Sequence, residues 1–103
     1  GLKFTQLKDL KEIEERLDVL FSQIEDAFKA KNFDALLPIL EEKQNLLDSL
    51  SIKMEKQVQR TRSSDSSPKN TMLYISLLQE TQDLIVATMN ILEHYYIEYK
   101  KHM

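Results

Sequence analysis

The chain has 103 residues, which is enough for one domain with a single core, and its 17 acidic and 14 basic side chains give a net charge of −3. One glycine, two prolines and no cysteine exclude a Gly-rich phosphate loop, disulfides and thiolate metal sites. Residues 1–52 carry 7 basic and 11 acidic side chains, and residues 53–103 carry 7 basic and 6 acidic side chains. Neither half is basic enough to predict a surface that binds nucleic acid. No apolar run approaches the ~18 residues of a membrane span, and no signal peptide is apparent. The abundance of helix formers predicts an all-α domain.

A first helix is predicted over residues 4–30. Its apolar side chains recur every three or four residues, which places them on one face of a helix, and charged side chains fill the other faces. Lys29 and Lys31 suit the helix C-terminus, where they oppose the negative end of the helix dipole. The short connection over residues 29–34 favours an antiparallel second helix. The apolar stripe consists of Phe4, Leu7, Leu10, Ile13, Leu17, Leu20, Phe21, Ile24 and Phe28.

The second helix is predicted over residues 34–62, with Pro38 tolerated in its first turn because few intrahelical bonds exist there. Its apolar stripe consists of Leu36, Leu37, Leu40, Leu47, Leu50, Met54 and Val58. The last turns become basic, with Lys53, Lys56, Arg60 and Arg62. We interpret these four side chains as a solvated face that complements the helix C-terminus. The alternative is a contact to a phosphate or to an acidic partner.

The third helix is predicted over residues 68–101, with Ser67 as N-cap and Pro68 at its first position. It carries the widest apolar stripe in the chain, and we expect its core residues to be Leu77, Leu84, Ile91 and Tyr95. Three tyrosines gather at its end, namely Tyr95, Tyr96 and Tyr99. They are expected to cap one end of the fold, and an exposed aromatic interface is the alternative.

These elements predict an antiparallel up-down-up three-helix bundle in a single domain over residues 1–103. Two partner helices are too few to cover the wide stripe of the third helix. We therefore expect self-association, so that a homo-oligomer completes the bundle to four helices or more.

Catalysis and cofactor binding are not predicted. The chain has no cysteine, and His94 and His102 lack a Ser or Asp partner at a recognisable spacing. His94 and Glu98 are expected to form a surface pair. Glu80 and Asp83 share one side of the third helix, which the apolar stripe places outward. One or two of Glu41, Glu42 and Asp48 are expected to approach a bundle groove, and these carboxylates do not converge on a metal.

A family pattern is carried by three further features of the chain. Residues 33–54 read FDALLPILEEKQNLLDSLSIKM, and the basic tract at residues 59–62 leads into a Ser-rich loop that ends at Pro68. The third helix then begins with MLYISLL at residues 72–78 and continues to Asn90 and Ile91. Because of these features, residues 33–93, about 60 of the 103, resemble the PhoU-like helical domain. That domain is found at the cytoplasmic C-terminus of bacterial sodium-dependent phosphate cotransporters and in free-standing PhoU regulators.

One departure from that family concerns metal binding. The third helix of the family carries a Glu and an Asp four residues apart, and the matching positions here are Gln82 and Val86, with Ser76 at another acidic position. An amide and an apolar side chain supply no charge for a divalent cation, so no metal is expected.

The resemblance implies a soluble regulatory domain excised from a longer transporter, on the cytoplasmic side of the cell membrane. Its partners would be the transporter's membrane domain or a second copy, contacted by helix packing, with Lys53, Lys56, Arg60, Arg62 and the three tyrosines as candidate contacts. The segment itself would not enter the membrane. The alternative function is a helical protein-binding module such as an export-chaperone-like bundle, which residues 33–50 also fit. A chaperone should leave an apolar groove open, whereas the transporter domain should have a closed core.

Overall fold

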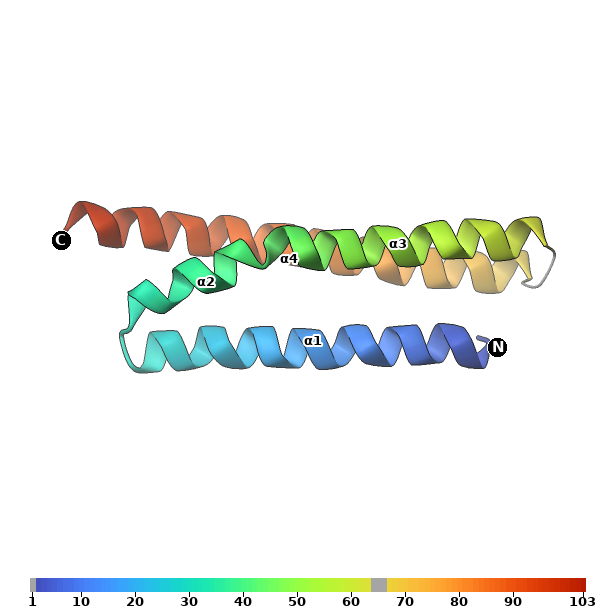
Figure 1. Cartoon of the computed structure of the whole chain (residues 1–103), viewed down its shortest axis with the longest axis horizontal. Helices are drawn as coiled ribbons and strands as arrows, with labels where there is room; N and C mark the ends of the chain where they lie inside the picture. Colours follow the sequence, from blue (N-terminus) through green and yellow to red (C-terminus); the bar gives the residue numbers. More distant parts are fainter. Residues whose placement is uncertain (1, 64–66) are drawn as a thin grey trace.

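The computed structural model describes residues 2–63 and 67–103, and it confirms the prediction of an all-helical bundle: the described residues contain no strand. Helix α1 spans Phe4–Lys29, a 3₁₀ turn η1 spans Phe33–Ala35, and α2, α3 and α4 span Leu36–Glu41, Lys43–Arg62 and Pro68–Lys101. In Figure 1, α1 runs away from the N-terminus, α2 and α3 return beside it, and α4 runs back to the C-terminus at the opposite end. The bundle is elongated, with extents of 56 × 19 × 17 Å.

The helix ends follow the capping residues of the sequence. Ser67 caps α4, because its Oγ accepts a hydrogen bond from the backbone N–H of Asn70 at 3.1 Å, and Pro68 begins the helix. Helix α1 ends with Lys31 in the left-handed region at φ 52°, and the N–H groups of Lys31 and Asn32 bond to the carbonyls of Phe28 and Ala27. This pair of bonds is a Schellman motif, which satisfies two terminal carbonyls and turns the chain toward α2.

The prediction of one continuous helix over residues 34–62 is wrong. The chain winds as a 3₁₀ turn before Leu36, and the helix is interrupted again at Glu42, whose N–H bonds to the carbonyl of Ile39 three residues earlier at 3.2 Å. Pro38 has no N–H, and its ring crowds the carbonyl four residues before it, which disfavours regular α-helix in the first turn. The tighter turn at Glu42 changes the direction of the chain, so that α2 slants between α3 and the end of α1 (Figure 1).

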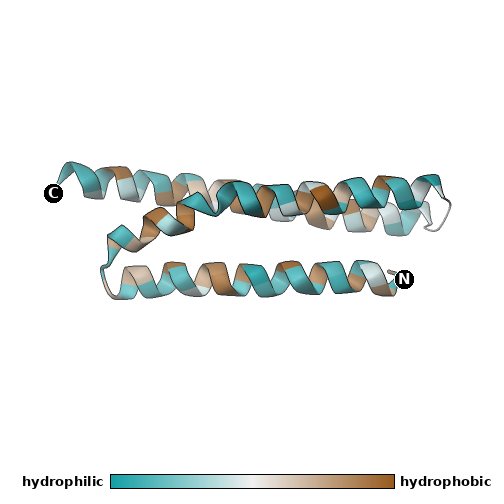
Figure 2. Ribbon diagram, viewed as in Figure 1, coloured by the Kyte–Doolittle hydropathy of each residue, from teal (hydrophilic) through white to brown (hydrophobic). Residues whose placement is uncertain are grey.

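The bundle has three antiparallel arms: α1, the pair α2 and α3 (the α2–α3 arm), and α4. All three contribute to the core, and Figure 2 shows hydrophobic residues recurring along every helix. On α4 the inward face differs by one residue from the predicted one. Leu78, Ile85 and Leu92 are buried, together with Tyr74 and Met89, whereas Leu77 is half-buried and Leu84, Ile91 and Tyr95 are 46%, 58% and 53% exposed. The apolar residues of α4 occupy two adjacent faces, and packing against α3 and α2 selects the face that carries Tyr74 and Met89. The remaining buried apolar residues are Ile13, Leu20, Ala27, Leu36, Ile39, Leu46 and Leu50.

Candidate functional site

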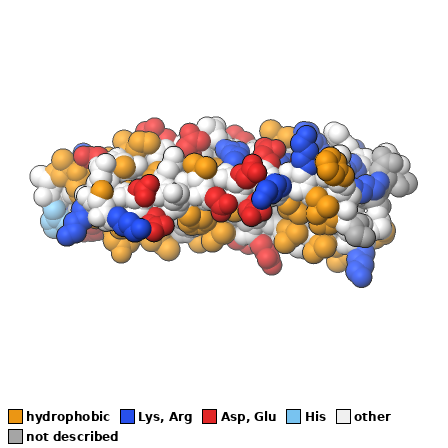
Figure 3. All heavy atoms as spheres, turned by 90° about the horizontal axis from the view of Figure 1, so that it is seen from below, with side chains coloured by type: hydrophobic (Ala, Val, Ile, Leu, Met, Phe, Trp, Pro, Cys, Tyr) orange, Lys and Arg blue, Asp and Glu red, His pale blue; other side chains and the backbone are white. Residues whose placement is uncertain are grey.

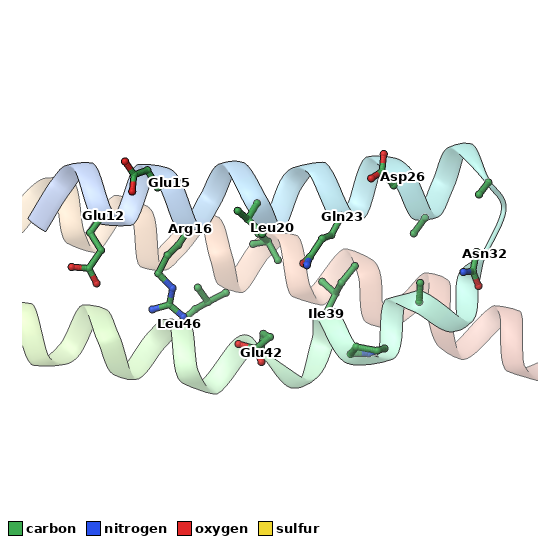
Figure 4. A pocket seen from close by; sticks show the side chains of 15 residues that line it. Glu12, Glu15, Arg16, Leu20, Gln23, Asp26, Asn32, Ile39, Glu42 and Leu46 are labelled. Atoms are coloured by element: carbon green, nitrogen blue, oxygen red, sulfur yellow. The ribbon is translucent and has the colours of Figure 1, made fainter.

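An open groove of about 890 Å³ lies between α1 and the α2–α3 arm. In Figure 4, Leu20 from α1 and Ile39 and Leu46 from the opposite arm point into the space between the two walls, and the ribbon of α4 passes behind them. Val19 and Pro38 extend this apolar lining to the surface, and Val19 is 58% exposed. The floor residues belong to the buried core, with Leu20, Ile39 and Leu46 only 4%, 5% and 7% exposed, so the accessible apolar surface of the groove lies mainly on Val19 and Pro38.

The position of the groove follows from the interruption at Glu42. Because α2 leaves the line of α3 there, the arm passes α1 at an angle, and Ile39 and Leu46 face Leu20 from either side of the bend (Figure 4). On α1 the lining residues recur at helical spacing, which lines a single face. This α1 series consists of Glu12, Glu15, Arg16, Val19, Leu20, Gln23, Asp26, Ala27 and Ala30.

Acidic side chains dominate the rim of the groove. Glu12, Glu15 and Asp26 stand on α1 and Glu42 on the facing arm, against Arg16 as the one cation among the lining residues. In Figure 4, Glu12 and Arg16 extend toward the opposite wall, while Glu15 and Asp26 point away from the floor along the outer edge of α1. The rim thus carries a net negative charge above an apolar floor. Of the carboxylates that the sequence placed near a bundle groove, Glu42 lies here.

Two of the four basic side chains on α3 are directed inward, so the prediction of a solvated basic face is wrong for them. Lys53 is 8% exposed, and its Nζ lies 3.4 Å from Oε1 of Glu12 and 3.4 Å from Oγ of Ser49. Arg60 reaches Oδ2 of Asp9 at 3.5 Å. Both cations join α3 to α1, because a partly desolvated ammonium or guanidinium needs a carboxylate within reach. Lys56 and Arg62 are exposed and stay candidates for a partner contact.

A buried polar cluster, which the sequence did not predict, crosses the bundle near the start of α1. Gln6 and Gln57 are fully buried, and Nε2 of Gln6 donates to Oε1 of Gln57 at 2.9 Å. Gln57 in turn donates to Thr71 on α4 at 3.2 Å, and Gln6 Oε1 accepts from the backbone N–H of Lys3. These bonds join α1, α3 and α4 in one layer. Gln6 lies seven residues before the buried Ile13, and Gln57 lies seven residues after the buried Leu50. This spacing places both glutamines at core positions of their helices, and it is the sequence feature from which their burial could have been predicted.

Tyr74 continues this cluster toward the surface. Its hydroxyl donates to Oδ2 of Asp9 at 2.9 Å, and Asp9 also receives Arg60. Burial is the main reason that the pKa of Tyr74 is raised to about 12, and the adjacent Asp9 carboxylate raises it further while Arg60 opposes this. The phenol is therefore a structural hydrogen-bond donor at neutral pH.

The tyrosines of α4 lie at the connection between α1 and α2, where a cap was expected. The rings form a chain of contacts, with centroids 5.1 Å apart for Tyr95–Phe28, 5.5 Å for Phe28–Phe33 and 5.6 Å for Phe33–Tyr99, and Tyr96 lies 6.3 Å from Tyr99. Tyr95–Phe28 and Phe28–Phe33 are edge-to-face pairs, with interplanar angles of 90° and 76°, and such pairs stabilise an interface beyond simple burial. Burial and a hydrogen bond with Asp34 raise the pKa of Tyr99. The cluster joins the ends of α1, η1 and α4.

The remaining candidate residues lie apart from the groove. Gln82 and Val86 are half-buried in the middle of α4, and Glu80 and Asp83 are exposed. Across residues 2–63 and 67–103, no three His, Asp or Glu side chains converge enough to hold a metal ion. The expected His94–Glu98 pair is replaced by contacts of Glu98 with Lys101 at 3.2 Å and His102 at 3.9 Å. None of the described helices combines the length and hydropathy needed to cross a bilayer.

A second apolar surface lies on α4. Leu73, Leu84, Ile91 and Tyr95, here named the outer α4 stripe, are each about half exposed, with values of 50%, 46%, 58% and 53%. Their separations of eleven, seven and four residues place them on one side of the helix. Figure 3, seen from the side of α1, shows charged side chains along the middle of the molecule and hydrophobic side chains along its edges.

Comparisons of the chain with protein-family models, with curated proteins and with solved structures gave no match. The assignment of a function therefore rests on the groove and on the surfaces described above.

Proposed function

We propose that the chain is a non-catalytic, helical protein-binding module that holds an amphipathic helix of a partner in the open groove, in the manner of an export chaperone. The open apolar groove carries this proposal, because it is the feature expected of such a module, whereas a transporter regulatory domain was expected to have a closed core. An amphipathic helix lays its apolar face into a groove of this kind through residues at i, i+3, i+4 and i+7.

The length of the groove suits one helix. Its α1 wall extends from Glu12 to Ala30, which corresponds to about 27 Å at 1.5 Å per residue, and so to a partner helix of about 18 residues. Such a helix would bring the bundle to four helices and would cover the exposed lining residues Val19 and Pro38. Burial of apolar surface at about 25 cal/mol per Å² would supply the main favourable term in binding.

Fluorescence anisotropy with a defined probe tests the proposal. The probe, named the Gln peptide, is a fluorescein-labelled helical peptide of about 18 residues with leucines on one face and glutamine and alanine elsewhere. We expect saturable binding that Val19→Glu weakens about tenfold, because a charge on the exposed lining of the groove would face the leucines. Val58→Glu is the matched control, since Val58 is 48% exposed on α3 outside the groove. Absence of binding, or equal weakening by both variants, contradicts the proposal.

The PhoU-like accessory role is the second candidate, and the outer α4 stripe is the observation that favours it. In this role the domain regulates a phosphate transporter from the cytoplasmic side of the membrane and packs against its membrane domain or against a second copy. The stripe would pair with its equivalent on a second chain, extending the bundle beyond three helices.

Sedimentation velocity over a dilution series tests this self-association. We expect the mass of the wild-type protein to rise with concentration and the Leu84→Glu/Ile91→Glu variant to stay monomeric. Ile52→Glu serves as the control, because Ile52 is 52% exposed on α3 and lies outside the stripe. A wild-type chain that stays monomeric at high concentration rules out the self-association.

A further inference from the structure

We infer that the helix held in the groove is basic, with lysine or arginine side chains on both flanks of its apolar face. The inference rests on the proposed function and adds the chemistry of the partner. It follows from the lining of the groove, which includes four carboxylates and one cation, Arg16: Glu12 and Glu42 lie beside the space between the walls, and Glu15 and Asp26 lie along the outer edge of α1 (Figure 4).

The carboxylates occupy both walls. Glu12, Glu15 and Asp26 stand on α1, and Glu42 stands on the opposite arm at the interruption between α2 and α3 (Figure 4). A partner helix between the walls would therefore meet an acidic group on either side. Cationic side chains suit this arrangement, because a lysine or arginine stem packs along apolar surface while its charged end reaches a rim carboxylate.

Internal ion pairs leave most of this charge available. Glu12 contacts Lys53 at 3.4 Å but stays 56% exposed. Glu15 and Glu42 form no ion pair with another described residue. A partner with acidic flanks would bring like charges together at the rim, which disfavours it.

The spacing of the carboxylates sets the pattern of the partner. Glu12 and Asp26 are fourteen residues apart on α1, which corresponds to about 21 Å along the groove. Two cations of the partner helix that contact Glu12 and Asp26 would be separated by about four helical turns. Glu15 and Glu42 lie on opposite walls, so they would contact cations on opposite flanks of the partner helix. The partner is therefore a helix with an apolar ridge and several basic residues along its length, rather than one with a single basic end.

Three peptides with the same leucine pattern test the inference: the Gln peptide, a Lys peptide and a Glu peptide, in which lysine or glutamate replaces the flanking glutamines. At low ionic strength we expect the Lys peptide to bind about tenfold more tightly than the Gln peptide and the Glu peptide to bind more weakly than either. Added salt should reduce these differences, since the rim is open to solvent.

Matched charge variants assign the effect to the rim. Glu15→Gln/Glu42→Gln should reduce the preference for the Lys peptide, whereas Glu14→Gln/Glu55→Gln changes the net charge equally at exposed positions outside the groove and should preserve it. If the three peptides bind equally well, the inference is wrong while the helix-binding function stands. If both double variants reduce the preference equally, the attraction belongs to the whole protein and the inference is again wrong. If no peptide binds, the proposed function itself is wrong.

Discussion

The side-chain amide of Gln6 on α1 donates a hydrogen bond of 2.9 Å to the amide oxygen of Gln57 on α3, and both side chains are fully buried. An apolar pair at these positions would tolerate a shift of one helix along the other, whereas paired amides are satisfied in one alignment. Gln57 extends the constraint to α4 through Thr71. We interpret this cluster as the element that sets the register of the three helices.

Replacement of one glutamine should cost more than replacement of both. Gln6→Leu or Gln57→Leu leaves the other buried amide without this bond, which should lower the free energy of unfolding by about 1–3 kcal/mol. The double variant should lose less than the sum of the two single losses, because it removes both polar groups. Urea unfolding of the four proteins completes the cycle, and strictly additive losses would show that the two amides are not coupled.

Tyr74 should make the protein sensitive to alkaline pH. Its pKa in the folded protein is raised from 10 to about 12, so its contribution to stability is fully present below pH 10 and is lost as the pH rises through 12. Between these values the unfolded chain releases the phenolic proton and the folded chain retains it, which favours unfolding. Urea titrations at several pH values should show a steeper loss of stability for the wild type than for Tyr74→Phe. Equal slopes would contradict this role.

Lys31 offers a position at which stability can be gained. Its φ of 52° lies in the left-handed region, where a residue with a Cβ is strained and glycine is not. Lys31→Gly should raise the free energy of unfolding by about 0.5–1 kcal/mol, or the melting temperature by a few degrees. Lys31→Ala is the control for the loss of charge, and a gain as large in this variant would attribute the effect to the charge.

The buried end of Lys53 should be replaceable by an apolar group. Lys53→Met keeps the length of the side chain and removes an ammonium that is 8% exposed, while Glu12 stays in contact with solvent. We expect a stability equal to or above that of the wild type, since the desolvation of a buried ion offsets its ion pair. Thermal unfolding followed by circular dichroism measures the change. A loss above about 2 kcal/mol would show that the pair with Glu12 stabilises the fold.

The sequence was sufficient for the helix ends, because these depend on local chemistry. The helix over 68–101 and its cap at Ser67 were predicted, and the first helix ends one residue before its predicted end. The continuous second helix was not correct: the chain winds as a 3₁₀ turn before Leu36 and the helix is interrupted again at Glu42. Pro38 is a local signal for the irregular first turn, whereas the interruption at Glu42 has none.

The inward face of α4 could not be predicted for a related reason. Leu84 and Ile85 both belong to seven-residue series, and periodicity alone does not decide which series faces the other helices. The structure buries Ile85 and exposes Leu84, because the adjacent Tyr74 and Met89 complete the buried face. The burial of Lys53 and the groove also depend on contacts between helices that are far apart in the sequence.

The binding of a helix in the open groove is tested most directly by an NMR titration of the ¹⁵N-labelled chain with the Lys peptide. The account predicts that the backbone amide signals of Val19, Gln23, Ile39 and Leu46 shift and saturate together, while those of Leu84 and Ile91 on the outer α4 stripe do not move. Shifts that gather on the outer α4 stripe, or spectra that do not change at saturating peptide, would contradict it.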